Sequence, residues 1–147
     1  MNLKKDLRKI FILRTDYWGG KPHDKQIVTE FVKNIQDTYF TLSGRGAGNW
    51  SARFYQVLYL GRIPIVVNTD IVLPFEDKIN WNDIIILCNS NNDIANNIKR
   101  AWISKDIIQM QIKCKEVYDT YLAPEKWCKF IVNDIFLPIK EKTSVLC

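Results

Sequence analysis

Residues 38–67 have the sequence TYFTLSGRGAGNWSARFYQVLYLGRIPIVV, and this stretch decides the fold. A strand pattern over about residues 38–42 is followed by a glycine-rich turn and then by a helix pattern from Ser51 to Leu60 that stops at Gly61. A second strand pattern, Ile63 to Val67, follows at once and contains the continuous β-branched run typical of a strand buried on both faces. The stretch predicts a βαβ unit with parallel strands and a right-handed crossover.

The segments on either side extend this pattern. Upstream, the apolar run at residues 10–14 predicts a buried strand, and a helix capped by Asp24 carries an apolar stripe that we expect to cover a sheet face. Downstream, residues 84–87 predict a further strand, and the chain becomes helical from Asp93 onward, with Ser104 as the expected cap of a second helix. The sequence therefore predicts an α/β protein, a parallel sheet flanked by helices, with a helical C-terminal region.

Composition narrows the class of protein. The 147 residues are 47% hydrophobic and 25% charged, which is typical of one globular domain. The net charge of +5 is spread along the chain and is not interleaved with aromatic residues, so we expect an anionic small ligand and no nucleic-acid partner. Four cysteines without a CxxC pair and a single histidine disfavour a zinc site. No long apolar run or leader pattern is seen, which predicts a cytoplasmic protein with reduced thiols.

The segment SGRGAGNWSARFYQ, residues 43–56, is the best candidate for chemistry. Glycines between a strand and a helix let the backbone approach a phosphate, and Arg45 and Arg53 can add charge-assisted hydrogen bonds to its oxygens. The segment is not a G-x-G-x-x-G fingerprint, because Asn49 stands where the third glycine would be, and it lacks the lysine of a P-loop. On spacing alone, a diphosphate site and a tight structural turn are equally good interpretations.

A longer run, RGAGNWSARFYQVLYLGRIPIVVNTDIVLPFEDKINW from Arg45 to Trp81, resembles the exostosin-type glycosyltransferases. Their pattern contains RG, then S-x-RF, then G-x-IPV, then LPF and a D-W pair, in this order and at this spacing. The resemblance implies a Rossmann-like domain, the C-terminal half of a GT-B fold, that binds a nucleotide-sugar donor, usually a UDP-sugar. The implied partners are this donor and a glycan or polysaccharide acceptor.

The resemblance also implies roles for individual residues. Arg45 would contact the diphosphate, with Ser51 and Arg53 supporting it, and the residue at position 56 would face the ribose. Gln56 departs from the family here, because the usual residue is a glutamate, and the loss of its charge weakens the expected hold on the ribose. The acidic pair that follows LPF, Glu76 and Asp77, could contact the sugar or could lie in a solvent-exposed turn. The full set of expected donor-binding residues is Arg45, Gly46, Asn49, Ser51, Arg53, Gln56, Glu76 and Asp77.

Other polar and aromatic residues have weaker functional interpretations. Asn68 and Asp70 are better explained by a turn, and His23 by a surface loop than by a catalytic base. Trp50 and Tyr55 could stack on a uracil ring, although core packing is the more common role of such aromatics.

GT-B enzymes place the acceptor site on an N-terminal domain. In this sequence only about ten residues precede the first expected strand, which is too few for such a domain. We therefore expect residues 1–147 to form a single donor-binding domain without that acceptor domain, and leave the catalytic base unassigned. The chain would act with a separately encoded acceptor domain, which could hold it at a membrane, or be a non-catalytic module that keeps the fold. Since no D-x-D pair occurs, we expect no metal or other cofactor, with Arg45, Arg53 and the helix N-terminus neutralising the diphosphate.

Overall fold

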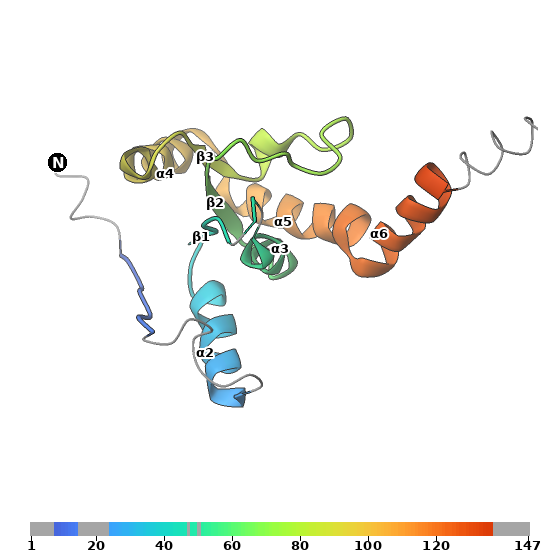
Figure 1. The fold of residues 1–147 in the computed structure, drawn as a ribbon. Coiled ribbons are helices and arrows are strands. Elements are labelled where there is room, and N and C mark those ends of the chain that lie inside the picture. Colours follow the sequence, from blue (N-terminus) through green and yellow to red (C-terminus); the bar gives the residue numbers. More distant parts are fainter. Residues whose placement is uncertain (1–7, 15–23, 47, 50, 137–147) are drawn as a thin grey trace, which may run out of the picture.

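A parallel three-stranded sheet forms the centre of the molecule in a computed structural model, which describes residues 8–14, 24–46, 48–49 and 51–136. The strands are β1 (Phe40–Leu42), β2 (Ile63–Val67) and β3 (Ile86–Cys88), in the order β1-β2-β3. Both pairs are parallel, with Leu42 beside Ile65 and Ile65 beside Ile86. The predicted parallel sheet is therefore confirmed, with β2 as its central strand (Figure 1).

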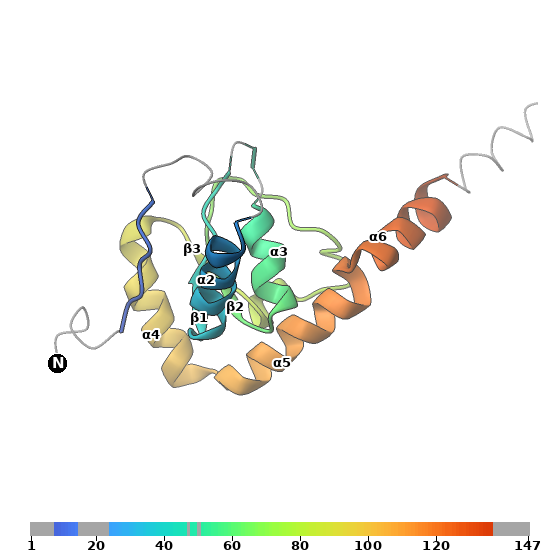
Figure 2. The same ribbon diagram turned by 90° about the horizontal axis from the view of Figure 1, so that it is seen from below.

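Helices flank this sheet. The α-helices are α2 (Lys25–Gln36), α3 (Ala52–Tyr59), α4 (Ile94–Ser104), α5 (Ile107–Val117) and α6 (Pro124–Phe130). Short 3-10 turns occupy Trp81–Asp83 and Asn91–Asp93, and π-helical turns occupy Tyr118–Leu122 and Ile131–Phe136. Figure 2 shows α4 and α3 on opposite sides of the sheet, with α5 running below and α6 extending away from it. The arrangement is a Rossmann-like α/β fold.

The end of α3 fixes the crossover from β1 to β2. Gly61 adopts a left-handed conformation with φ of 61°, which glycine tolerates without strain. The Gly61 N–H donates to the Leu58 carbonyl (2.9 Å) and the Arg62 N–H to the Val57 carbonyl (3.0 Å), which is a Schellman motif. This confirms the predicted stop at Gly61 and explains why β2 can start two residues later.

The core lies between β2, β3, α3 and α5. Leu58, Ile63 and Ile84 are almost completely buried there, as is Cys114. The Cys114 thiol donates to the Ile84 carbonyl (3.2 Å), and burial raises the pKa of this thiol to about 12. A thiol held neutral in this way packs as a small apolar side chain.

The predicted strand at residues 10–14 is wrong. Residues 8–14 form no regular structure, and Leu13 and Phe11 expose 92% and 76% of their surface. An apolar run forms a strand only where its backbone N–H and C=O groups pair with those of a neighbouring strand. In this sheet β1 pairs with β2 and β2 pairs with β3, and residues 10–14 take no part.

The prediction that the apolar stripe of α2 covers a face of the sheet is also wrong. Of its apolar side chains only Ile35 is buried, and Val28 is 53% exposed. Figure 1 shows α2 projecting away from the sheet. The Asp24 cap of this helix is confirmed, because its carboxylate accepts from the Gln26 N–H at 2.9 Å.

Two boundaries downstream differ from the sequence expectation. The third strand starts at Ile86, because the chain first makes a 3-10 turn over Trp81–Asp83. The second C-terminal helix is capped by Asp106 and not by Ser104. The Asp106 carboxylate accepts from the Gln109 N–H (3.1 Å), whereas the Ser104 hydroxyl donates back to the Arg100 carbonyl in the last turn of α4 (2.7 Å).

Candidate functional site

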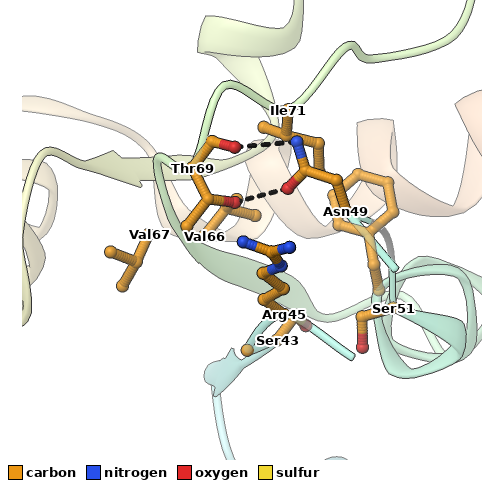
Figure 3. Close-up of a pocket in the computed structure, with 10 residues that line it drawn as sticks. Ser43, Arg45, Asn49, Ser51, Val66, Val67, Thr69 and Ile71 are labelled. Atoms are coloured by element: carbon orange, nitrogen blue, oxygen red, sulfur yellow. Dashed lines mark hydrogen bonds between the residues drawn. The ribbon is translucent and has the colours of Figure 1, made fainter. Parts of the chain in front are cut away.

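The glycine-rich loop lies at the carboxyl ends of β1 and β2, where open parallel sheets bind their ligands. A small pocket opens between this loop, the start of α3 and the chain that leaves β2. Its polar wall is formed by Ser43, Arg45, Asn49, Ser51 and Thr69, and its apolar wall includes Phe54, Val66 and Ile71 (Figure 3). The structure therefore brings Arg45, Asn49 and Ser51, three of the predicted site residues, to one place.

The pocket is shallow, with room for about one water molecule. A ligand of the size of a nucleotide must therefore lie across the rim, with only one or two of its atoms inside.

Asn49 joins the glycine-rich loop to the turn after β2. Its amide nitrogen donates to the carbonyl oxygens of Thr69 (2.7 Å) and Asp70 (2.9 Å), and its amide oxygen accepts from the Thr69 hydroxyl (2.6 Å). Two of these contacts are visible in Figure 3 as the Asn49–Thr69 pair. The amide nitrogen and the amide oxygen of Asn49 are thus both bound to the protein, which suits a residue that sets the shape of the pocket.

The turn that Asn49 holds is the predicted Asn-Thr-Asp turn, which is confirmed. The Asn68 side chain accepts from the Asp70 N–H (3.1 Å), and Asp70 has φ of 57°. A left-handed conformation is strained for aspartate, so the contacts from Asn49 and Asn68 are needed to maintain it.

Arg45 supplies an available positive charge at the pocket. Its side chain is exposed, and Figure 3 shows its guanidinium directed toward the Asn49–Thr69 pair. Within the described ranges it makes no hydrogen bond and no ion pair. A guanidinium without a protein partner can direct its donors to a bound anion.

The N-terminus of α3 is open in the same region. Ser51 occupies the N-cap position, yet its hydroxyl makes no capping hydrogen bond, and the first turn of α3 holds no acidic residue. The first N–H groups of a helix carry partial positive charge, and no carboxylate competes for them here. Ser51 also lines the pocket, so its hydroxyl is free to contact a ligand.

Three predicted residues lie outside the pocket wall. The Arg53 guanidinium carbon lies 5.0 Å from the centre of the Phe31 ring, so this side chain extends toward α2. Gln56 is exposed on α3, and Gly46 is exposed in the glycine-rich loop, but neither lines the pocket.

The predicted acidic pair also lies apart from the pocket. Glu76 accepts from the Leu73 N–H (3.3 Å), which closes its own loop, and Asp77 is exposed. Phe75, which precedes them, has φ of 54°. Its ring lies against Tyr121, Trp127 and Phe130, with ring centres 5.7, 5.2 and 4.6 Å away.

Sequence reasoning did not assign two polar pocket residues, Ser43 and Thr69, to the donor site. Ser43 is only 4% exposed, and Thr69 becomes important only through its contact with Asn49. No local signal distinguishes them from other small polar residues. The Tyr55 ring packs edge-on against Phe54 (5.3 Å), and burial raises the pKa of its phenol, which supports the core interpretation. His23 and Trp50 lie outside the described residues.

The described part of the chain has neither a metal-binding cluster nor a membrane-spanning helix. There, no three His, Cys, Asp or Glu side chains gather in a way that could hold a metal ion. The helices of the same residues are all too short or too polar to cross a membrane.

The parallel sheet, the helices on both of its faces and the polar pocket at the carboxyl ends of its strands define a Rossmann-like α/β domain. The Exostosin GT47 domain matches residues 10–103, which is more than half of the chain. The chain therefore belongs to the exostosin GT47 family of glycosyltransferases, as the resemblance implied.

Two plant proteins are among those similar to the chain. Over 56 residues the chain is 39% identical to "Probable beta-1,4-xylosyltransferase IRX10L" of Arabidopsis thaliana, a stretch that covers 38% of this chain and 14% of that protein. Over 56 residues it is 36% identical to "Probable glucuronosyltransferase GUT1" of Oryza sativa subsp. japonica, which covers 38% of this chain and 13% of that protein. The chain thus matches a small part of these relatives. No solved structure matches it significantly.

Proposed function

We propose that this chain is the donor-binding part of a glycosyltransferase and binds a UDP-sugar, whose sugar is transferred to a glycan or polysaccharide acceptor. The observation that carries the proposal is the Arg45 guanidinium, which has no partner among the described residues and lies in the same pocket as the N-cap of α3, at the carboxyl ends of β1 and β2. Both groups attract a diphosphate, because one donates charge-assisted hydrogen bonds and the other presents oriented N–H groups.

The same groups have a mechanistic role when the sugar is transferred. Negative charge grows on the diphosphate as its bond to the sugar breaks, and groups already oriented toward that charge stabilise the transition state. Arg45 and α3 supply positive charge at this point without a metal ion, and we propose that none is required. The general base that deprotonates the acceptor belongs to the acceptor half of a GT-B enzyme, of which this chain would be the C-terminal half.

Calorimetric titration tests the proposal. UDP, GDP, UDP-glucuronate and UDP-galactose are titrated into the wild-type chain and into Arg45→Ala, with and without EDTA. We expect UDP and at least one UDP-sugar to bind, and Arg45→Ala to lose about tenfold to a hundredfold in affinity, because a hydrogen bond to a charged group contributes about 1.5–3 kcal/mol. EDTA should leave the affinity unchanged.

Arg100→Ala is the matched control. Arg100 is exposed on α4, away from the pocket, and the change removes the same charge. This variant should bind like the wild type. Equal losses in the two arginine variants would mean that only the net charge of the protein matters, and no binding by the wild type would contradict the proposal.

A second candidate function is a non-catalytic module that keeps the fold and pairs with a separate acceptor domain. Gln56 favours it, because the position expected to hold the ribose has lost its carboxylate and the side chain lies outside the pocket wall. The two candidates differ in turnover. When the chain is mixed with an acceptor domain and a glycan, a transferase forms product, whereas a module binds its partner without releasing UDP from the donor.

A further inference from the structure

Thr41 and Ser43, two residues apart at the end of β1, have buried polar side chains that differ in hydrogen bonding. Thr41 is 6% exposed, and its hydroxyl lies 3.2 Å from the Thr38 hydroxyl. Ser43 is 4% exposed, and its hydroxyl has no hydrogen-bond partner in the described part of the protein. Buried hydroxyl groups are normally paired, so the Ser43 side chain requires an explanation.

The position of Ser43 is fixed by its backbone and borders the pocket. Its N–H donates to the Ile65 carbonyl (2.9 Å), which continues the pairing of β1 with β2 by one residue. Ser43 is one of the residues that line the pocket, together with Arg45 and Ser51. Next to it, a Cβ atom at Gly44 would meet no atom within 4 Å, so the approach from this side is open.

An unpartnered buried hydroxyl costs free energy, and no side chain among the described residues offsets that cost for Ser43. A ligand oxygen in the pocket would do so. Because Arg45 and the start of α3 favour an anion there, the fitting partner is an oxygen that only accepts hydrogen bonds, as phosphoryl oxygens do.

We propose that the Ser43 hydroxyl donates a hydrogen bond to a phosphoryl oxygen of the donor diphosphate. The inference rests on the proposed function, since it assigns one contact within that site. The pocket has room for about one water molecule, so in the free protein a water can occupy the place that the phosphoryl oxygen takes.

The test compares Ser43→Ala with Thr41→Val by thermal unfolding and by titration with UDP, uridine and inorganic pyrophosphate. Ser43→Ala removes an unpaired hydroxyl, so the melting temperature of the free protein should stay constant or rise, while the affinity for UDP and pyrophosphate falls about tenfold. Any affinity for uridine should not change. Thr41→Val removes a paired hydroxyl of similar burial and should lower the melting temperature without weakening UDP binding.

The outcomes separate this inference from the function on which it rests. If the wild type binds UDP and Ser43→Ala binds it equally well, the phosphoryl contact is wrong while the donor site stands. A melting temperature that falls in Ser43→Ala as it does in Thr41→Val would show a structural role for the hydroxyl and overturn the inference. If the wild type binds none of the probes, the proposed function itself is contradicted.

Discussion

The loops that follow β1 and β2 lie side by side at the same edge of the sheet but differ in how their polar groups are used. In the first loop, residues 43–51, Ser43, Arg45 and Ser51 have side chains without hydrogen-bond partners among the described residues. In the second loop, residues 68–80, Asn68 and Glu76 are bound to neighbouring backbone groups. Apart from Asn49, which is bound to the second loop, these side chains of the first loop are therefore available for a ligand, whereas Asn68 and Glu76 hold the shape of the second loop.

The difference shows that exposure and charge alone do not identify a binding residue. Glu76 and Asp77 are exposed and acidic and follow a family motif, yet they lie outside the pocket. Ser43 is buried and neutral, yet it lines the pocket without a partner. The deciding property is whether the protein already satisfies the group, and changes in the two loops should separate stability from affinity.

The largest effect is expected where the second loop is anchored. Trp81 is 6% exposed, its indole N–H donates to the Pro74 carbonyl (3.0 Å), and its ring lies 5.5 Å from that of Phe54. Trp81→Ala should lower the free energy of unfolding by about 3–5 kcal/mol, measured by urea denaturation, because it leaves a cavity in the core.

Trp102→Ala provides the matched control for that measurement. Trp102 is 53% exposed on α4 and packs edge-on against Tyr39 (5.2 Å), so its removal should cost only about 1 kcal/mol. Similar losses in the two variants would mean that Trp81 does not anchor the loop as its contacts indicate.

Features set by neighbouring residues could be predicted from the sequence. The stop of α3 depends on Gly61, the cap of α2 on Asp24, and β2 on a continuous β-branched run. The place of the pocket also followed from sequence, because a glycine-rich turn after a parallel strand puts Arg45 and Ser51 at the carboxyl edge of the sheet.

Features set by distant partners could not be predicted. The apolar run at residues 10–14 fits a strand, but the sequence does not show whether a neighbouring strand pairs with it. Ser104 and Asp106 are both good caps, and only the geometry of the α4–α5 connection selects Asp106. The importance of Ser43 is a property of the folded pocket, since an unpaired hydroxyl has no local sequence signature.

A smaller effect is expected at the connection between the two loops. Asn49→Asp replaces the amide nitrogen that donates to two carbonyl oxygens by an oxygen that repels them. The free energy of unfolding should fall by about 0.5–1.5 kcal/mol in urea denaturation, because two hydrogen bonds that join the loops are lost at a site that water can reach.

Asn68→Asp makes the same chemical change at the other end of the turn and serves as the control. Asn68 uses its side-chain oxygen to accept from the Asp70 N–H, and a carboxylate keeps this acceptor. Its free energy of unfolding should change by no more than about 0.5 kcal/mol. Equal losses in the two variants would indicate a general effect of added negative charge, and would remove Asn49 as the link between the loops.

The smallest effect on stability is expected at Ser51, in the first loop. Replacing a serine N-cap by alanine normally costs about 0.5–2 kcal/mol, but the Ser51 hydroxyl makes no capping hydrogen bond that could be lost. Ser51→Ala should therefore change the free energy of unfolding by less than about 0.5 kcal/mol while weakening UDP binding about threefold to tenfold, as expected for one hydrogen bond. Asp106→Ala, where the carboxylate does cap α5, should cost about 1 kcal/mol and leave UDP binding unchanged. If Ser51→Ala destabilised the protein as much as Asp106→Ala, its hydroxyl would be a cap in solution, and the first loop would have one group fewer for its ligand.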